Sequence, residues 1–174
     1  NLLVDLLNWA RSQSENIEME RENINIYQIA QENVDMLSER AIQKNIEIRS
    51  EIKKNCLAYA DKNMVSTIIR NLLTNAVKFT PAKGTVKISS DIDENVLKVT
   101  ISDTGIGISD ENINKLFRLD TFYRTLGTDK EKGTGLGLIL CKEFIAKLEG
   151  RIWVESKVGK GSRFIFTLPQ TTKT

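Results

Sequence analysis

The most regular pattern of hydrophobic positions in this chain runs from residue 62 to residue 79. Apolar pairs recur there every four residues, which predicts an α-helix with a broad buried face. Asp61 stands before the pattern as an N-cap, and Pro81 follows it as a stop. The four pairs are Met64/Val65, Ile68/Ile69, Leu72/Leu73 and Ala76/Val77.

Helical spacing returns at residues 30–41 and 136–149, and Gly150 is expected to cap the second of these helices. Alternating apolar and polar positions predict short strands elsewhere, the last two of them joined as a hairpin by a Gly-Lys-Gly turn. The predicted strands cover residues 24–28, 46–52, 57–59, 85–90, 96–103, 151–156 and 162–168. This mixture predicts an α+β fold, a two-layer sandwich with helices on one face of a mostly antiparallel sheet.

Residues 1–10 repeat leucine at helical spacing, and the residues that follow are polar. We therefore expect a helix end and a linker in residues 1–21, whose upstream partner is missing, and one domain in residues 22–174. The polar stretch at 109–134 is long for a connection in a compact domain, which indicates a functional lid.

The composition narrows the chemistry, because the 174 residues include no histidine. This excludes a Ser-His-Asp triad, imidazole acid–base catalysis and histidine metal ligands. The net charge of +2 comes from evenly mixed signs, so we expect no nucleic-acid partner. Neither a membrane span nor a signal peptide is evident. Cys56 and Cys141 form no C-x-x-C pair, which indicates a reducing, cytoplasmic setting.

Three groups of residues suggest a ligand site, and the first lies on the predicted helix 62–79. Asn71, Asn75 and Lys78 fall within a narrow arc beside its apolar stripe. Asparagine is a mediocre helix former, so two of them one turn apart call for a reason. An amide oxygen suits Mg²⁺ and an ammonium suits phosphate, although a solvated polar face remains an equal alternative.

The second group is Asp103-Thr-Gly105-Ile-Gly107, at the end of the predicted strand 96–103. Alternation places the carboxylate at the end of a buried apolar column, where it needs a hydrogen-bond donor. The glycines permit a tight turn or the close approach of a ligand. Two alternatives are an aspartate that closes a turn and one half of a dimeric aspartic protease, which needs two facing carboxylates.

The third group, Gly133-Thr-Gly135-Leu-Gly137, leads directly into the predicted helix 136–149. Glycines before a helix N-terminus leave backbone N–H groups able to bind phosphate. The spacing matches neither a Walker loop nor a dinucleotide-binding fingerprint, and by itself the motif could be a flexible hinge. Together, however, the three groups describe a site for a purine nucleoside triphosphate with Mg²⁺.

At these motifs the sequence resembles the catalytic ATP-binding domain of sensor histidine kinases, in the superfamily shared with gyrase, MutL-type proteins and a class of chaperones. The asparagine helix resembles the N-box, and the two glycine motifs resemble the two glycine boxes. Val158-Gly-Lys-Gly161-Ser resembles the closing glycine turn of many members. The resemblance covers roughly residues 22–170 and implies a Bergerat-type ATP-binding fold; residues 6–13 resemble more loosely the end of a dimerisation-domain helix.

The resemblance also implies roles for single residues. Asn75 would hold Mg²⁺ against the ATP phosphates, with Asn71 beside it and Lys78 on a phosphate. Residues 116–124 resemble the F-box, and of its two arginines Arg124 is preferred to Arg118 for the γ-phosphate. The remaining nucleotide contacts would be Asp103 to the adenine amino group, Phe79 beside the adenine, and Gly105, Ile106, Gly107, Gly133, Thr134, Gly135, Leu136 and Gly137 around the nucleotide.

The implied activity is that of a protein-histidine kinase. The hydrolases of the superfamily carry a glutamate where this chain has Asn71, and an amide cannot serve as that base. The implied partners are a histidine-bearing dimerisation domain of the same protein and a response regulator receiver domain. The implied full-length protein is a homodimer, with this domain in the cytoplasm and inner-membrane anchoring left open. A serine/threonine kinase of the anti-sigma type and a non-catalytic nucleotide-sensing module are the alternatives on the same fold.

Overall fold

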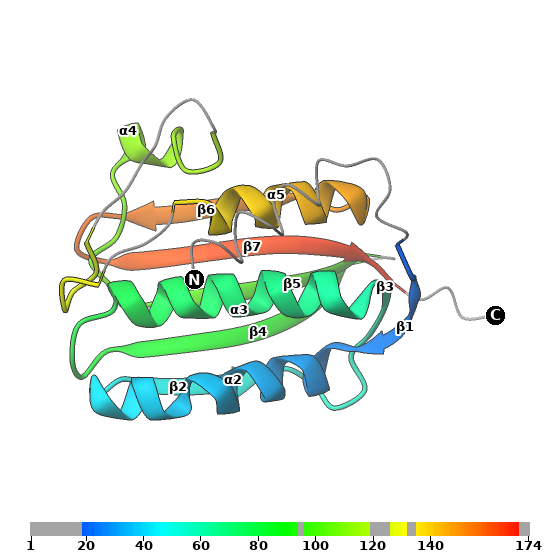
Figure 1. Cartoon of the computed structure of the whole chain (residues 1–174), viewed down its shortest axis with the longest axis horizontal. Helices are drawn as coiled ribbons and strands as arrows, with labels where there is room; N and C mark the ends of the chain where they lie inside the picture. Colours follow the sequence, from blue (N-terminus) through cyan, green and yellow to red (C-terminus); the bar gives the residue numbers. More distant parts are fainter. Residues whose placement is uncertain (1–18, 94–95, 119–125, 132–134, 171–174) are drawn as a thin grey trace.

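A computed structural model of the chain describes residues 19–93, 96–118, 126–131 and 135–170 (Figure 1). Along the chain its elements are β1 (Glu22–Asn25), α2 (Ile26–Gln43), β2 (Glu47–Glu51), β3 (Leu57–Ala60), α3 (Lys62–Phe79), β4 (Thr85–Asp93), β5 (Val96–Asp103), α4 (Asp110–Ile113), α5 (Gly137–Lys147), β6 (Ile152–Lys157) and β7 (Gly161–Pro169). Helices separate pairs of consecutive strands, so the chain mixes both kinds of element, as the hydrophobic pattern predicts.

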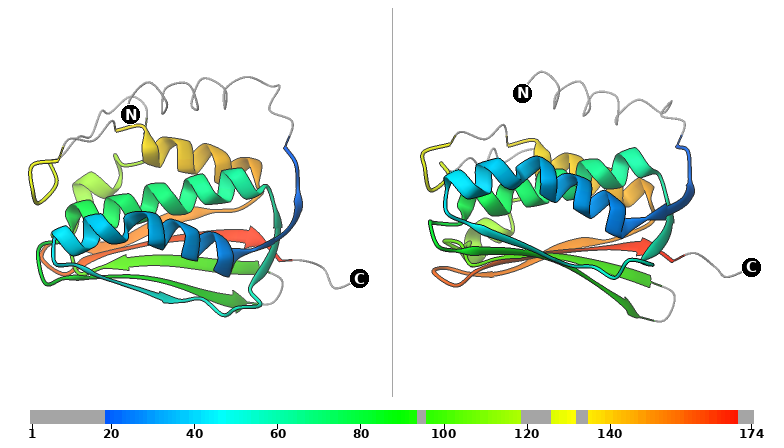
Figure 2. Two further views of the ribbon diagram at one scale, coloured as in Figure 1. Left: turned by 60° about the horizontal axis from the view of Figure 1, so that its bottom comes forward. Right: turned by 90° about the horizontal axis from the view of Figure 1, so that it is seen from below.

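The strands form one large sheet and one small one. The large sheet has the order β2-β4-β5-β7-β6, with β2 parallel to β4 and every other pair antiparallel. Strands β1 and β3 pair with each other in a separate antiparallel sheet. Helices α2, α3 and α5 lie over one face of the large sheet, as Figure 2 shows. The predicted two-layer α+β sandwich is confirmed.

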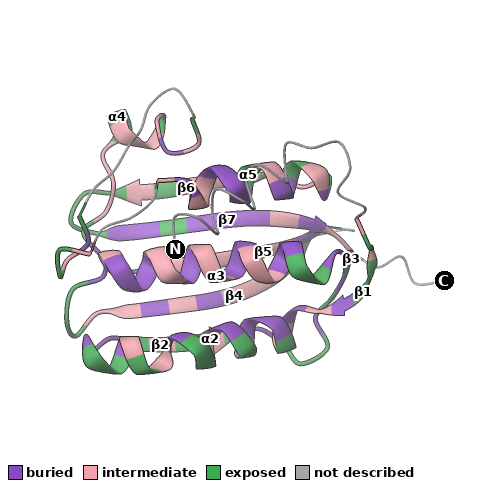
Figure 3. Cartoon of the chain, in the orientation of Figure 1, coloured by how far each residue is buried: buried purple, intermediate pink, exposed green. Residues whose placement is uncertain are grey.

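The core lies between the helices and the large sheet, and α3 runs through its middle (Figure 3). This helix begins where predicted, because the Asp61 carboxylate accepts hydrogen bonds from the N–H groups of Asn63 at 2.9 Å and Met64 at 3.0 Å. Its predicted apolar pairs are all buried. The polar arc of the helix is thereby held next to the ends of the central strands.

Strand register brings the first glycine motif beside the closing glycine turn. Asp103 pairs with Val86 of β4 on one side and with Ser162 of β7 on the other. Because β5 and β7 are antiparallel, the end of β5 meets the beginning of β7. Two segments that are far apart in the sequence therefore meet at the left-hand end of the sheet in Figure 1.

Two local predictions are wrong. The predicted strand at 24–28 ends at Asn25, because the Asn25 side chain accepts a hydrogen bond from the Tyr27 N–H at 3.0 Å and starts helix α2. Gly150 is not the residue with left-handed backbone after α5, since Glu149 takes that conformation with φ 60°. A Cβ on Gly150 would lie 2.0 Å from the Thr167 carbonyl oxygen, so close packing explains this glycine.

The polar stretch at 109–134 contains a short helix, α4, that the hydrophobic pattern does not reveal. The predicted helix end and linker at residues 1–21 fall almost wholly outside the described residues, as do 119–125 and 132–134. None of the described helices combines the length and the apolar character that crossing a membrane would require.

Candidate functional site

The Asp103 carboxylate lies at the junction of β5 and β7. Its Oδ1 accepts hydrogen bonds from the Gly105 N–H at 2.8 Å and from the Ser162 N–H at 3.2 Å. Within the described part of the chain these are its two donors, and both bind the same oxygen. The second oxygen, Oδ2, can accept a hydrogen bond from a ligand.

Burial sets the charge state of this carboxylate. Asp103 is only 9% exposed, and the loss of hydration raises its pKa to about 6, even though the N–H groups of Gly105 and Ser162 pull the pKa down. A buried carboxylate with a strongly raised pKa is a common feature of functional sites. Asp103 is thus a buried carboxyl group whose ionisation the fold disfavours.

The first glycine motif packs directly against the end of α3. A Cβ on Gly105 would lie 2.5 Å from the Phe79 carbonyl oxygen and 2.5 Å from Asp103 Oδ1, so only glycine fits at this position. The Ile106 N–H donates to the Phe79 carbonyl at 3.1 Å. The backbone of Phe79 and the carboxylate of Asp103 are therefore both held against the same short turn.

The hairpin of β6 and β7 braces this turn from the other side. Gly107 has φ 71°, and a Cβ there would lie 2.0 Å from the Lys157 carbonyl oxygen. The Gly159 N–H donates to the Ile106 carbonyl at 2.7 Å, and the Ser156 hydroxyl accepts from the Ile108 N–H at 2.9 Å. The two glycine segments, residues 103–108 and 156–162, form one fixed unit.

The second glycine motif meets the polar face of α3. A Cβ on Gly137, the first residue of α5, would lie 2.9 Å from Asn71 Oδ1. Asn71 Nδ2 donates to the Thr67 carbonyl at 3.0 Å, which fixes the plane of its amide group. Gly135 has φ 78°, in the left-handed region. The start of α5 therefore approaches the asparagine helix as closely as a residue without a side chain allows.

The other predicted residues of α3, namely Asn75, Lys78 and Phe79, lie near its C-terminal end. The Lys78 ammonium is 4.6 Å from the centroid of the Phe79 ring, and burial lowers the pKa of this lysine. Asn75 lies three residues before Lys78 and is partly exposed. Arg124, Gly133 and Thr134 fall outside the described residues, and Leu136 directly precedes α5.

Sequence reasoning missed three groups that hold the site together. Ser162 and Ser156 bond to the glycine turn, and the only signal for them was their place beside the closing glycine turn. Lys44 is buried at the end of α2, and its Nζ donates to the Lys78 carbonyl at 3.1 Å. No local pattern marks Lys44, because its partners are 33 or more residues away.

A hollow of roughly 610 Å³ lies on the face of the large sheet that the helices leave open. Its walls are mostly charged side chains, such as Lys87, Lys157 and Arg163, and it reaches the site at Asp103 and Ser162. Residues of α3 and α5 do not line it. The predicted ligand residues of α3 and α5 therefore lie outside this hollow, and Asp103 is at its edge.

The chain matches a known protein family and resembles curated proteins over almost its whole length. Residues 60–172 match the family described as histidine kinase-, DNA gyrase B-, and HSP90-like ATPase. The chain is similar to the adaptive-response sensory kinase SasA of Gloeothece citriformis, with 31% identity over 97% of the chain and 43% of that protein. It is 34% identical to the sensor histidine kinase WalK of Bacillus subtilis, over 97% of the chain and 28% of that protein. The chain thus spans less than half of these relatives.

Solved structures give the same result. The catalytic domain of histidine kinase ThkA superposes with a TM-score of 0.77 at 30% identity, over 88% of this chain and 97% of that domain. Full-length ShkA in complex with AMPPNP superposes with a TM-score of 0.84 at 28% identity, over 99% of this chain and 36% of that one. The fold of this chain is that of the histidine kinase catalytic domain of ThkA.

Proposed function

Because the chain belongs to the histidine kinase-, DNA gyrase B-, and HSP90-like ATPase family and is a catalytic domain of the sensor histidine kinase type, we propose that it transfers the γ-phosphate of ATP to a histidine on a separate dimerisation domain. The observation that carries the proposal is the Asp103 carboxylate, buried against Gly105 and Ser162 with one oxygen left to accept a hydrogen bond. An exocyclic amino group of adenine is a donor that fits it.

The adenine end of the proposed site is made by α3 and the turn after β5. Asp103 would accept from the adenine amino group, and Phe79 would border the ring. Gly105 supports this assignment, because the contact between the turn and the Phe79 carbonyl leaves no space for a side chain. Ile106 is 46% exposed and Gly107 lies beside it, so both would face the nucleotide from the turn.

The phosphate end would use the polar arc of α3 and the beginning of α5. We propose that Asn75 holds Mg²⁺, that Lys78 meets a phosphate oxygen and that Asn71 orients the phosphates. The backbone N–H groups of residues 133–137 would add donors, since a helix N-terminus attracts anions. The close approach of Gly137 to Asn71 supports a site shared by these two elements. Arg124 stays the proposed partner of the γ-phosphate.

Bound ATP and Mg²⁺ would supply the transferable phosphoryl group and the neutralising charge. The residues of this chain would hold the phosphates in line and stabilise negative charge, which is how most of the rate enhancement of phosphoryl transfer arises. Asn71 is an amide, so it cannot accept a proton from water as a general base. The domain is therefore proposed to protect ATP from hydrolysis until an acceptor is presented.

The acceptor must come from outside this sequence, because the chain has no histidine. We propose that it is a histidine on the dimerisation domain of the same full-length protein, which would act as a homodimer. A response regulator receiver domain is the proposed next acceptor, and a solved complex of histidine kinase ThkA with response regulator TrrA gives a precedent for such a partner in a structurally similar protein.

The test mixes the chain with γ-labelled ATP, Mg²⁺ and a separate dimerisation domain that carries the acceptor histidine. We expect label on the dimerisation domain that is lost in acid and stable in base, as a phosphoramidate is. A dimerisation domain with that histidine changed to alanine is the control and should stay unlabelled. Acid-stable label on serine or threonine would indicate the anti-sigma type of kinase, and binding without any transfer would indicate a nucleotide-sensing module.

A further inference from the structure

Lys44, the residue that ends helix α2, has an almost fully buried side chain. It is 8% exposed, and its Nζ lies 3.0 Å from the Val77 carbonyl oxygen and 3.1 Å from the Lys78 carbonyl oxygen. On its other side Nζ lies 2.8 Å from the Thr128 hydroxyl and 3.0 Å from Glu131 Oε1. Lysine is rarely fully buried unless it is paired, so the partners of Lys44 indicate its role.

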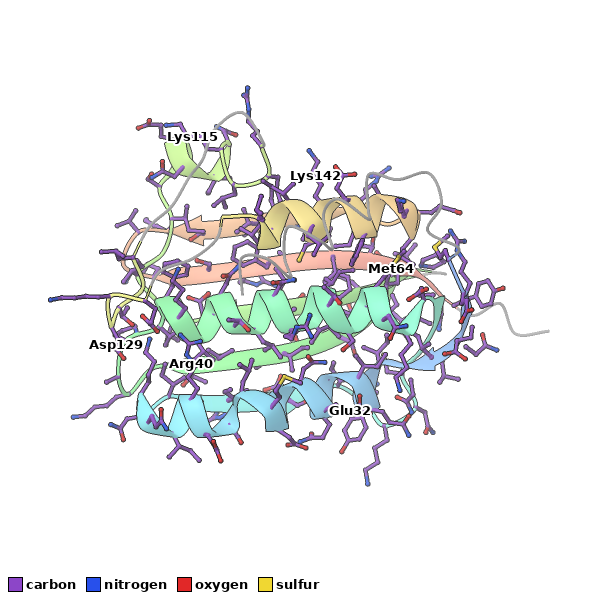
Figure 4. All side chains as sticks on the ribbon, in the orientation of Figure 1. Glu32, Arg40, Met64, Lys115, Asp129 and Lys142 are labelled. Carbon is purple, nitrogen blue, oxygen red and sulfur yellow. The ribbon has the colours of Figure 1, made fainter. Side chains whose placement is uncertain are left out.

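The partners of Lys44 fall into two groups that it connects. Val77 and Lys78 belong to the last turn of α3, where helix carbonyls lack partners within the helix. Thr128 and Glu131 belong to residues 126–131, which we call the anchor segment and which lies between the two glycine motifs in the sequence. Figure 4 shows Asp129 of this segment and Arg40 of α2 at the same end of the molecule.

Further hydrogen bonds hold the anchor segment against α3. The Thr128 N–H donates to the Lys78 carbonyl at 3.1 Å, and the Thr128 hydroxyl lies 3.1 Å from the carbonyl oxygen of Thr80. Within the segment the Gly127 N–H donates to the Glu131 carbonyl at 2.9 Å. The segment therefore closes over the end of the helix that carries the proposed phosphate-binding lysine.

Charge strengthens this attachment. Partial burial alone would raise the pKa of Glu131, but the hydrogen bond from Lys44 and that from the Asp129 N–H outweigh it and lower the pKa to about 2. Glu131 is consequently ionised at every pH at which the protein would work. Arg40 adds a second cation, 3.2 Å from Glu131 Oε1.

The anchor segment also touches the proposed nucleotide site. A Cβ on Gly127 would lie 2.6 Å from Cγ of Lys78, so the segment packs directly on the stem of that side chain. The Lys78 ammonium in turn lies over the Phe79 ring. A shift of the anchor segment would therefore move the side chain proposed to meet a phosphate.

We propose that Lys44 is a positioning residue of the nucleotide site: it clamps the anchor segment onto the end of α3 and so keeps Lys78 in the place where it meets the phosphates. This inference rests on the proposed ATP site. Lys44 itself has no contact with the adenine end, because Asp103 is held by its own two backbone donors. Replacing Lys44 should thus weaken the binding of the phosphates and leave recognition of the adenine intact.

The experiment replaces Lys44 with methionine and measures the affinities for ATP, ADP and adenosine by calorimetry or ligand-detected NMR. Lys44→Met is expected to lower the affinities for ATP and ADP by about tenfold, within the range usual for coupled sites. The affinity for adenosine should stay within twofold of the wild-type value. Lys142→Met removes an exposed lysine of α5 and is the matched control, expected to change none of the three. A merely structural role would weaken all three ligands equally.

Amide hydrogen exchange without nucleotide provides a second readout. The Gly127 and Thr128 amides should lose protection in Lys44→Met and keep it in Lys142→Met. Gly127→Ala keeps Lys44, but its methyl group would press on the Glu131 carboxylate and on Cγ of Lys78, so it should reproduce the selective loss of ATP and ADP affinity. It serves as the decisive variant if Lys44→Met does not fold.

The outcomes separate the two proposals. Unchanged ATP affinity in Lys44→Met and Gly127→Ala, or an equal loss for ATP and adenosine, would overturn the positioning role while leaving the proposed function standing. Failure of the wild-type chain to bind ATP would refute the proposed function, and the positioning role with it. Selective loss for the phosphate-bearing ligands, together with faster exchange at Gly127 and Thr128, supports both.

Discussion

Replacing Asp103 with asparagine should stabilise the nucleotide-free protein at pH 8. Burial raises the pKa of the carboxyl from 3.8 to about 6, a difference of about 2.2. At 1.36 kcal/mol per unit, the buried charge costs at most about 3 kcal/mol above pH 6. An asparagine Oδ1 can still accept from the N–H groups of Gly105 and Ser162, so the variant keeps both hydrogen bonds and loses only the charge.

The sign of the pH dependence follows from the raised pKa. Below pH 3.8 the carboxyl is protonated in both the folded and the unfolded chain, so it has no effect on stability. Between pH 3.8 and about 6 the folded chain holds a proton that the unfolded chain has lost, and stability falls as pH rises. The advantage of Asp103→Asn should therefore be absent near pH 4 and complete at pH 8.

With ATP bound, wild type should become more stable than Asp103→Asn. With its Oδ1 engaged, asparagine presents its NH₂ group to the adenine amino group, and two donors repel each other. ATP at a thousand times its Kd would stabilise wild type by about 4.1 kcal/mol and the variant not at all, which exceeds the advantage of about 3 kcal/mol that the variant has without ATP. Asp61→Asn, which alters another buried carboxylate at the opposite end of α3, is the control and should keep the full gain from ATP.

The assay is urea unfolding at a series of pH values from 4 to 8, with and without ATP and Mg²⁺. Two results would refute the reasoning. A variant less stable than wild type at pH 8 would mean that the folded state favours the ionised carboxylate. A variant with the full stabilisation by ATP would remove Asp103 from the adenine role.

Three further predictions address other parts of the molecule. Wild-type ATP affinity, measured by calorimetry, should fall as pH drops below about 6, because the protonated Asp103 loses acceptor strength; a flat profile from pH 5 to 8 would contradict this. Gly137→Ala should weaken ATP binding several-fold, because its methyl group would press on Asn71 Oδ1, whereas unaltered affinity would show that α5 can move away. Leu72→Ala, in the fully buried face of α3, should lower the free energy of unfolding by about 3 kcal/mol with an unchanged urea m-value, and a loss below about 1 kcal/mol would mean that the core collapses into the space.

The parts of the fold that sequence reasoning predicted depend on local periodicity. Helix α3 was predicted from its repeating apolar pairs and its Asp61 cap, both of which act within a few residues. The burial of Asp103 was predicted from strand alternation, because the strand continues its pattern to the last residue. The order of the glycine motifs then pointed to the ATPase family, whose model matches the chain.

The parts that it missed depend on contacts between distant segments. The sequence predicts Gly150 as a helix cap, yet a glycine is needed there because a side chain would collide with the Thr167 carbonyl oxygen of β7. Lys44 looked like an ordinary residue at a helix end, and only the folded chain brings Glu131 to it, 87 residues away. The roles of the individual site residues stay predictions, because packing defines their positions but not their ligand.

The donors that surround Asp103 have a consequence for the kinetics of folding. Gly105 is its neighbour in the chain, but Ser162 lies 59 residues further on, so the carboxylate is enclosed only when β7 has joined the sheet. Partly folded forms that lack β7 would have no adenine pocket. Nucleotide would then bind only the forms in which β7 has already paired with β5, so it could not stabilise earlier forms on the folding pathway.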